Sequence, residues 1–288
     1  MKRFAFLALA VLMSCQHRDP APDPAHEAEI LKWRADRLTR LKSESGWLSL
    51  VGLQWLNAGE NAISIPADGG KVALDAGKVT LIPNPAAALQ IDGKPVAAPT
   101  ELRNDTDPAG PTVVQRGSVR FNVIKRNDKY ALRIKDANSD ARTHFLGLDY
   151  FPVNPKFRFE ARFEPYDPPH KVPITNVLGM TSDETSPGAL AFEFEGQTYR
   201  VQPILEEGEK EWFIIFKDAT AGTETYPAAR YVYAAPPGPD GKTVLDFNKA
   251  YNPPCAFTPY ATCPLPPAQN KLPFRIEAGE KKYRGSAH

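Results

Sequence analysis

Apolar and polar residues alternate with a period of two through much of the chain between residues 60 and 250, and this pattern constrains the fold more than any other feature. Val119, Phe121 and Val123 follow it, for example, while helical spacing is absent over most of the region. Alternation places one set of side chains on one face of a strand, and proline, present 29 times, disfavours long helices. The sequence therefore predicts a mainly β fold of antiparallel sandwich- or barrel-like sheets.

Turn residues separate the alternating runs. Asp92-Gly93 joins Leu89–Ile91 to Lys94–Val96, and both residues of this dipeptide tolerate the positive φ that a tight hairpin needs. A polar turn at Arg126–Lys129 precedes the arm Tyr130–Ile134 of a second hairpin. We expect further strands in the apolar runs at 157–163, 190–194, 199–201, 212–216 and 231–234.

One amphipathic helix is expected before the sheets, from Ala25 to Lys42. Leu31, Ala35, Leu38 and Leu41 recur on one face at helical spacing, which predicts that this face is buried. The apolar and aromatic run that follows, Gly46–Leu56, is expected to pack under the helix as a buried strand or turn. Its two tryptophans are assigned to the core.

Length and charge exclude several classes of protein. The chain has 288 residues, enough for one large domain or two modest ones without a metal or cofactor. Its 35 basic and 34 acidic residues lack the excess of positive charge that nucleic acid binding usually requires. We treat residues 26–288 as one domain, in which the Pro-rich segment 165–173 is either a boundary between two β subdomains, 26–164 and 174–288, or a long loop.

The N-terminus has the features of an export signal. Two cations precede an apolar run of ten residues, too short to cross a bilayer, so residues 1–14 are predicted to be a signal peptide. The segment Leu12–Cys15 resembles a bacterial lipobox, which implies that Cys15 carries acyl chains after cleavage; an ordinary secretory signal is the alternative. Residues 15–25 then form a Pro-rich tether. The expected location is the cell envelope, and resemblance to sorted lipoproteins favours the periplasmic face of the outer membrane.

Two further cysteines, Cys255 and Cys263, remain after the anchor. In an oxidising compartment, paired thiols normally form a disulfide, which is the expectation here. Free buried thiols are one alternative. A metal site or a nucleophilic thiol is another, although no histidine lies nearby in the sequence.

Two segments contain more polar side chains with strict hydrogen-bond geometry than folding alone requires. They are residues 216–231 and residues 245–257 with their continuation to Asn270. Here the chain resembles the bacterial proteins of the domain of unknown function 1684 family, from about Trp33 to Tyr283. Three strings carry the resemblance: Gly46–Leu53, Asp218–Tyr226 and above all Asp246–Phe257. The resemblance implies kinship and transfers no catalytic residue.

The candidate ligand-binding residues lie in these two segments. A guanidinium, two carboxylates, amides and phenols are the mixture found in sugar and small-anion pockets. The seven candidates are Asp218, Tyr226, Arg230, Asp246, Asn248, Tyr251 and Asn252. The alternative is structural: Arg230 forms a buried ion pair with Asp218 or Asp246, and the asparagines close turns around Pro253-Pro254.

Three functions are compatible with these residues. The first is binding of a small polar ligand, anionic or saccharide-like, at the seven candidates. The second is hydrolysis of envelope glycans or esters, with Asp218 and Asp246 as acid and base. The third is a structural or assembly role in the envelope. His144 and His170 lack the spacing of metal ligands, and no metal or cofactor is expected.

Overall fold

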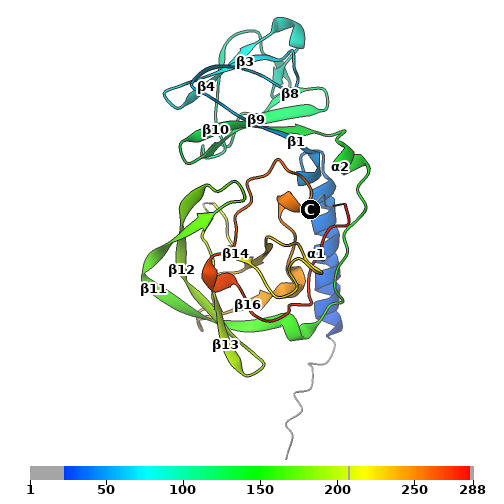
Figure 1. Ribbon diagram of the computed structural model, residues 1–288, viewed down its shortest axis with the longest axis vertical. Helices are drawn as coiled ribbons and strands as arrows, with labels where there is room; N and C mark the ends of the chain where they lie inside the picture. Colours follow the sequence, from blue (N-terminus) through cyan, green and yellow to red (C-terminus); the bar gives the residue numbers. More distant parts are fainter. Residues whose placement is uncertain (1–22, 207, 286–288) are drawn as a thin grey trace, which may run out of the picture.

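The computed structural model describes residues 23–206 and 208–285. The predicted signal peptide, Cys15 and most of the tether lie outside the described residues. The protein is mainly β, with several antiparallel sheets and one long N-terminal helix, as predicted. Figure 1 shows a small β lobe at one end of the molecule and a larger lobe at the other, with the helix along the side of the larger lobe.

Helix α1 spans Pro24–Lys42. The Asp23 side chain accepts a hydrogen bond from the backbone N–H of Ala25, and a proline occupies the first turn, so the helix begins with two favourable start signals. Its C-terminal turn carries basic residues, which complement the helix dipole.

The predicted buried face of α1 is wrong in part. Leu41 is buried, but Leu31 and Leu38 are 52% and 37% exposed. Two polar residues, His26 and Arg37, are buried instead, because the larger lobe presents carboxylates to them. Hydrophobic periodicity cannot detect a helix face that docks through ion pairs.

The small lobe consists of residues 50–136 and contains two sheets. Its core is a cluster of aliphatic side chains with Phe121 and Tyr130. One sheet has the order β1-β10-β9-β8-β5-β6 and the other β2-β3-β4-β7. The strands are β1 (Leu50–Trp55), β2 (Gly59–Ala62), β3 (Gly70–Asp75), β4 (Lys78–Pro83), β5 (Gln90–Ile91), β6 (Lys94–Pro95), β7 (Thr100–Leu102), β8 (Val114–Arg116), β9 (Val119–Arg126) and β10 (Lys129–Asp136).

Both predicted hairpins of this lobe are confirmed. Asp92 and Gly93 have φ values of 51° and 74° and connect β5 to β6. Asn127, with φ 52°, lies in the turn between β9 and β10. Hairpin turns depend on a few adjacent residues, which explains why the sequence predicts them well.

The larger lobe contains a four-stranded sheet, β13-β12-β11-β16, and a two-stranded sheet, β14-β15. Aromatic side chains of both sheets form its main core, in which Phe159, Phe192, Phe216 and Phe247 pack together. Its strands are β11 (Arg158–Thr175), β12 (Thr181–Phe194), β13 (Gln197–Val201), β14 (Trp212–Phe216), β15 (Arg230–Ala234) and β16 (Lys242–Asp246). β16 is an edge strand of the four-stranded sheet.

The Pro-rich segment 165–173 lies within β11, which runs alongside β12 on both sides of a register irregularity. The change from one hydrophobic core to the other occurs earlier, after β10. The short helical elements are η1 (Trp47–Ser49), η2 (Pro85–Ala87), α2 (Asp140–Thr143), η3 (Pro155–Phe157), η4 (Phe247–Lys249), η5 (Pro254–Ala256) and η6 (Ala268–Asn270).

Candidate ligand-binding cleft

Arg230 and Asp218 form a buried ion pair in the larger lobe. Arg230 begins β15 and Asp218 follows β14, so the hairpin-like pairing of these strands brings them together. Arg230 Nη2 lies 3.0 Å from Asp218 Oδ1, and both side chains are 1% exposed. The guanidinium also donates to the backbone carbonyls of Ile276 and Ala278.

The remaining oxygen of Asp218 is also occupied. Asp218 Oδ2 accepts hydrogen bonds from the backbone N–H and hydroxyl of Thr220 and from the backbone N–H of Ile276. Burial lowers the pKa of Arg230, and the neighbouring Asp218 opposes that effect. The structure thus contains the buried-pair arrangement, in which Arg230 and Asp218 hold strands and the C-terminal segment together.

Asp246 belongs to a second network, which shares no hydrogen-bond partner with Asp218 in the described part of the chain. Asp246 Oδ1 accepts from both the backbone N–H and the side-chain amide of Asn248, each at 2.9 Å, and thereby caps η4. His26 Nε2 lies 2.6 Å from the other oxygen. The two carboxylates are therefore parts of separate structural networks rather than one paired site.

The amide candidates bond to backbone groups far away in the chain. Asn248 is fully buried and exchanges two hydrogen bonds with the backbone of Asn154. Asn252 donates from its side chain to the carbonyl of Lys281 at 2.8 Å, while its Oδ1 has no hydrogen-bond partner. Tyr226 is buried in an apolar cluster. The two asparagines thus satisfy backbone groups of distant segments, whereas the structural alternative expected them to close turns around Pro253-Pro254.

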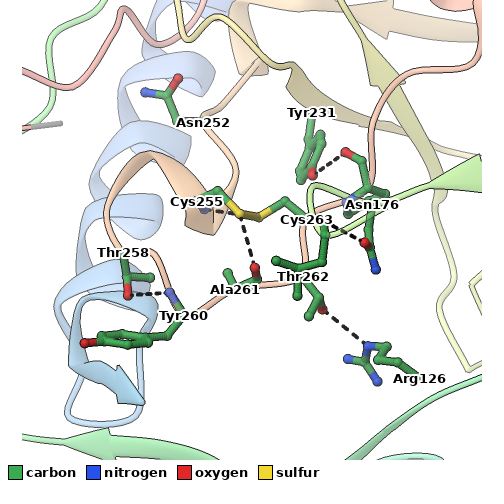
Figure 2. Close-up of a disulfide and its surroundings, with 12 residues drawn as sticks. Arg126, Asn176, Tyr231, Asn252, Cys255, Thr258, Tyr260, Ala261, Thr262 and Cys263 are labelled. Atoms are coloured by element: carbon green, nitrogen blue, oxygen red, sulfur yellow. Dashed lines mark hydrogen bonds between the residues drawn. A yellow bond between two sulfur atoms is a disulfide. The ribbon is translucent and has the colours of Figure 1, made fainter. Parts of the chain in front are cut away.

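Cys255 and Cys263 are joined by a disulfide, as expected. Figure 2 shows the bond beside Ala261, whose carbonyl lies near Cys255 Sγ, with Asn252 further along the same loop. Tyr231 of β15 donates from its hydroxyl to the carbonyl of Pro264, so the loop is also attached to the β14-β15 sheet (Figure 2). The disulfide-bonded loop is a fixed part of the larger lobe.

A cleft of about 1050 Å³ opens beside α1. One face of α1 forms a wall, and the opposite side comes from β15, β16 and the end of β10. Of the seven predicted residues, only Asp246 and Tyr251 line it. The other five lie in the buried networks and core described above.

Four aromatic side chains line the cleft among more numerous charged ones. Trp33 of α1 and Trp47 of η1 line it together with Tyr233 of β15 and Tyr251. The ring centres of Trp33 and Tyr251 lie 6.4 Å apart, and those of Tyr233 and Tyr251 lie 6.3 Å apart in a stacked arrangement. Burial raises the pKa of both tyrosines, so their hydroxyls remain neutral hydrogen-bonding groups. Such rings can contact the planar or apolar face of a ligand.

The charged groups of the cleft are only partly paired. Lys249 Nζ lies 2.6 Å from Glu29 Oε1, and this hydrogen bond lowers the pKa of Glu29. Arg40 and Lys135 form no ion pair with any described residue. Burial, reinforced by Arg133 and Arg120, lowers the pKa of Lys135 to about 8. Glu209 and Glu211 also line the cleft and form no ion pair with a described residue, so the cleft carries both signs of charge. The excess of positive charge is confined to the surroundings of Lys135, beside Arg133 and Arg120.

Sequence reasoning missed most of this cleft. Trp47 was assigned to the core, yet it is only partly buried and lines the opening. One signal was present in the sequence: Arg133 and Lys135 are two residues apart in a strand, so they share one face. Trp33 and Tyr233 carried no comparable signal, since their meeting depends on the docking of α1.

Two kinds of feature are absent from the described part of the chain. Nowhere in residues 23–206 and 208–285 do three or more His, Cys, Asp or Glu side chains gather as metal ligands would. Over the same residues, no helix has the length and apolarity needed to cross a bilayer.

Comparisons with known proteins identify a family but no activity. None of the curated proteins matches the chain. Among solved structures, it is similar to the solution NMR structure of an uncharacterized protein of Haloarcula marismortui, with 30% identity and a TM-score of 0.42 over 50% of this chain and 80% of that chain. Residues 143–281 match the family model described as "Protein of unknown function (DUF1684)". The chain thus belongs to the DUF1684 family of proteins of unknown function.

Proposed function

We propose that this protein is a lipid-anchored envelope protein that binds a small anionic ligand with a polar, saccharide-like body in the cleft beside α1. One observation carries the proposal: Arg40 and Lys135 line an aromatic cleft without a carboxylate partner in the described residues. A ligand carboxylate or phosphate would supply the missing negative charge.

The electrostatics favour an anion over a neutral ligand. A half-buried ammonium beside two guanidinium groups has an unfavourable free energy, which its lowered pKa reports. An anion placed near such a group gains more than it would in water, because the surrounding protein screens charge less. The rings of Trp33, Trp47 and Tyr251 suit a ligand body with an apolar face, as many sugars have.

Ligand titrations with paired compounds test this proposal. Glucuronate at about ten times its Kd is expected to add about 1.4 kcal/mol of stability, roughly a 3–5 °C rise in Tm, whereas glucose has a smaller effect. Lys135→Met should abolish most of the rise, measured by differential scanning fluorimetry at low salt. Lys32→Met is the matched control, since Lys32 lies on the exposed side of α1 and pairs with Asp36.

Three results would contradict anion binding in the cleft. They are equal shifts for glucuronate and glucose, a shift that persists in Lys135→Met, and the absence of a shift across a wider panel of anions that includes inorganic phosphate and citrate. The Lys32→Met control separates loss of a cleft cation from loss of net positive charge.

The proposal of a lipid anchor is based on the sequence before the described residues, namely the short apolar signal and Cys15. Cells fed labelled palmitate are expected to incorporate it into the wild-type chain, and Cys15→Ser should abolish incorporation. The neighbouring change Gln16→Asn should leave the label in place. Equal labelling of the Cys15→Ser chain would refute the anchor and leave the cleft proposal untouched.

A further inference from the structure

Lys135 differs from the other cleft lysine in what surrounds it. It lies on β10 directly across from Arg120 of β9, and Arg133 occupies the same face of β10 two residues earlier. Its Nζ donates to the backbone carbonyl of Ser45 at 2.5 Å and lies 5.5 Å from the centre of the Trp47 ring. Lys249 instead forms an ion pair with Glu29.

The two guanidinium groups next to Lys135 add positive charge that is only partly neutralised. Arg120 is paired with Glu44 at 3.0 Å, but Arg133 forms no hydrogen bond or ion pair with a described residue and only lies over the Trp47 ring. Burial lowers the pKa of Arg133 to about 10, so this group too is held in a poorly solvated position. Lys135 therefore projects into the cleft from a positively charged, partly dry strand face.

These surroundings increase the amount of free amine. With a pKa of about 8, about half of the Lys135 side chains are neutral at pH 8. An ordinary lysine, with a pKa of about 10.4, is neutral in well under about 1% of molecules at that pH. Desolvation combined with a neighbouring cation is a known way of activating a lysine as a nucleophile.

We propose that Lys135 forms a reversible imine with a small carbonyl compound that also carries a carboxylate, such as a 2-oxo acid or an aldehyde acid. The inference rests on the proposed function and specifies the class of ligand. The ligand carboxylate pairs with Arg40, which lines the cleft without an ion-pair partner in the described residues. The carbonyl carbon reaches Lys135, the cleft amine that has no ion pair in the same residues.

The bond-making step is balanced without an oxidant or reductant. The lone pair of neutral Nζ attacks the carbonyl carbon, and the carbonyl π pair moves to oxygen, which takes up a proton as nitrogen releases one. Loss of that hydroxyl as water then leaves the C=N bond, and addition of water reverses the reaction.

Borohydride trapping tests the imine directly. The folded protein is incubated with glyoxylate and then with sodium borohydride, and each lysine is quantified by peptide mass spectrometry. Modification of Lys135 is expected to exceed that of Lys249 by at least about tenfold at pH 7.5, because Lys249 is held in an ion pair with Glu29 and Lys135 is not. It should fall as the pH is lowered below 8, because protonation removes the nucleophile.

Two controls make the result specific. Lys135→Arg keeps the charge and should lose the trapped adduct without an increase at Lys249. Propanal, which lacks a carboxylate, should modify Lys135 less efficiently than glyoxylate. Equal labelling of Lys135 and Lys249, or equal labelling by the two aldehydes, would overturn the proposal.

Failure of the imine proposal can be distinguished from failure of the proposed function. A glucuronate-induced rise in Tm without an adduct at Lys135 would overturn only the imine. Absence of both would overturn anion binding in the cleft as well. An adduct formed selectively with glyoxylate supports both statements.

Discussion

Asp218→Ala is expected to lower the free energy of unfolding by about 3–5 kcal/mol, because it leaves the Arg230 guanidinium buried without its counter-charge. The loss includes the hydrogen bonds that Asp218 accepts from Thr220 and from the backbone N–H of Ile276. Urea denaturation followed by intrinsic fluorescence measures it. A shift of the midpoint at unchanged slope would show that stability, rather than compactness, has changed.

Asp149→Ala is the matched control for that experiment. Asp149 lies 2.7 Å from Arg284, a similar distance, but both side chains are substantially exposed. Exposed pairs contribute at most about 1 kcal/mol, so a much smaller loss is expected. A double variant, Asp218→Leu with Arg230→Met, should recover part of the stability because the unpaired charge is gone. If Asp218→Ala left the protein fully stable, a ligand-binding role for this carboxylate would return.

Glu280→Ala is expected to have an effect of similar size, about 3–5 kcal/mol, through a different attachment. Glu280 is fully buried and accepts hydrogen bonds from Arg37 Nε at 3.0 Å and from the backbone N–H of Asn252 at 2.8 Å. Its loss leaves Arg37 of α1 buried without a counter-charge, although Arg37 still donates to the carbonyl of Asn252. Because Arg37 lines the cleft beside Trp33, the variant should also reduce the glucuronate-induced rise in Tm.

Glu29→Ala provides the comparison on the same helix. It removes the ion pair with Lys249, which is partly exposed and therefore contributes at most about 1 kcal/mol. Thermal unfolding of both variants separates a general loosening of α1 from the specific loss of the buried pair. Equal destabilisation by Glu280→Ala and Glu29→Ala would contradict the importance assigned to the buried contact.

The local features of the fold were predictable because they depend on neighbouring residues. The hairpin at Asp92-Gly93 and the alternation in β9 and β10 are examples. The exposed face of α1 was not predictable in the same way. Leu31 and Leu38 have the spacing of a buried stripe, but the helix docks through His26 and Arg37, whose partners Asp246 and Glu280 lie more than two hundred residues away.

The candidate site, too, was predictable from the sequence only in part. Residue types alone led to Arg230 and Asp218, and to the alternative that they form a buried pair, but their burial depends on the packing of β14, β15 and the C-terminal segment. The cleft could not be predicted from the sequence, since its aromatic side chains come from four separate stretches of the chain.

What the sequence determined by itself is the β character, the hairpin turns and the family, because periodicity, turn chemistry and contiguous motifs are local. Only the tertiary structure decided which polar side chains are buried in ion pairs and which face the cleft. The physical reason is that the free energy of a charged side chain depends on its burial and its partners, and both are supplied by residues distant in the chain.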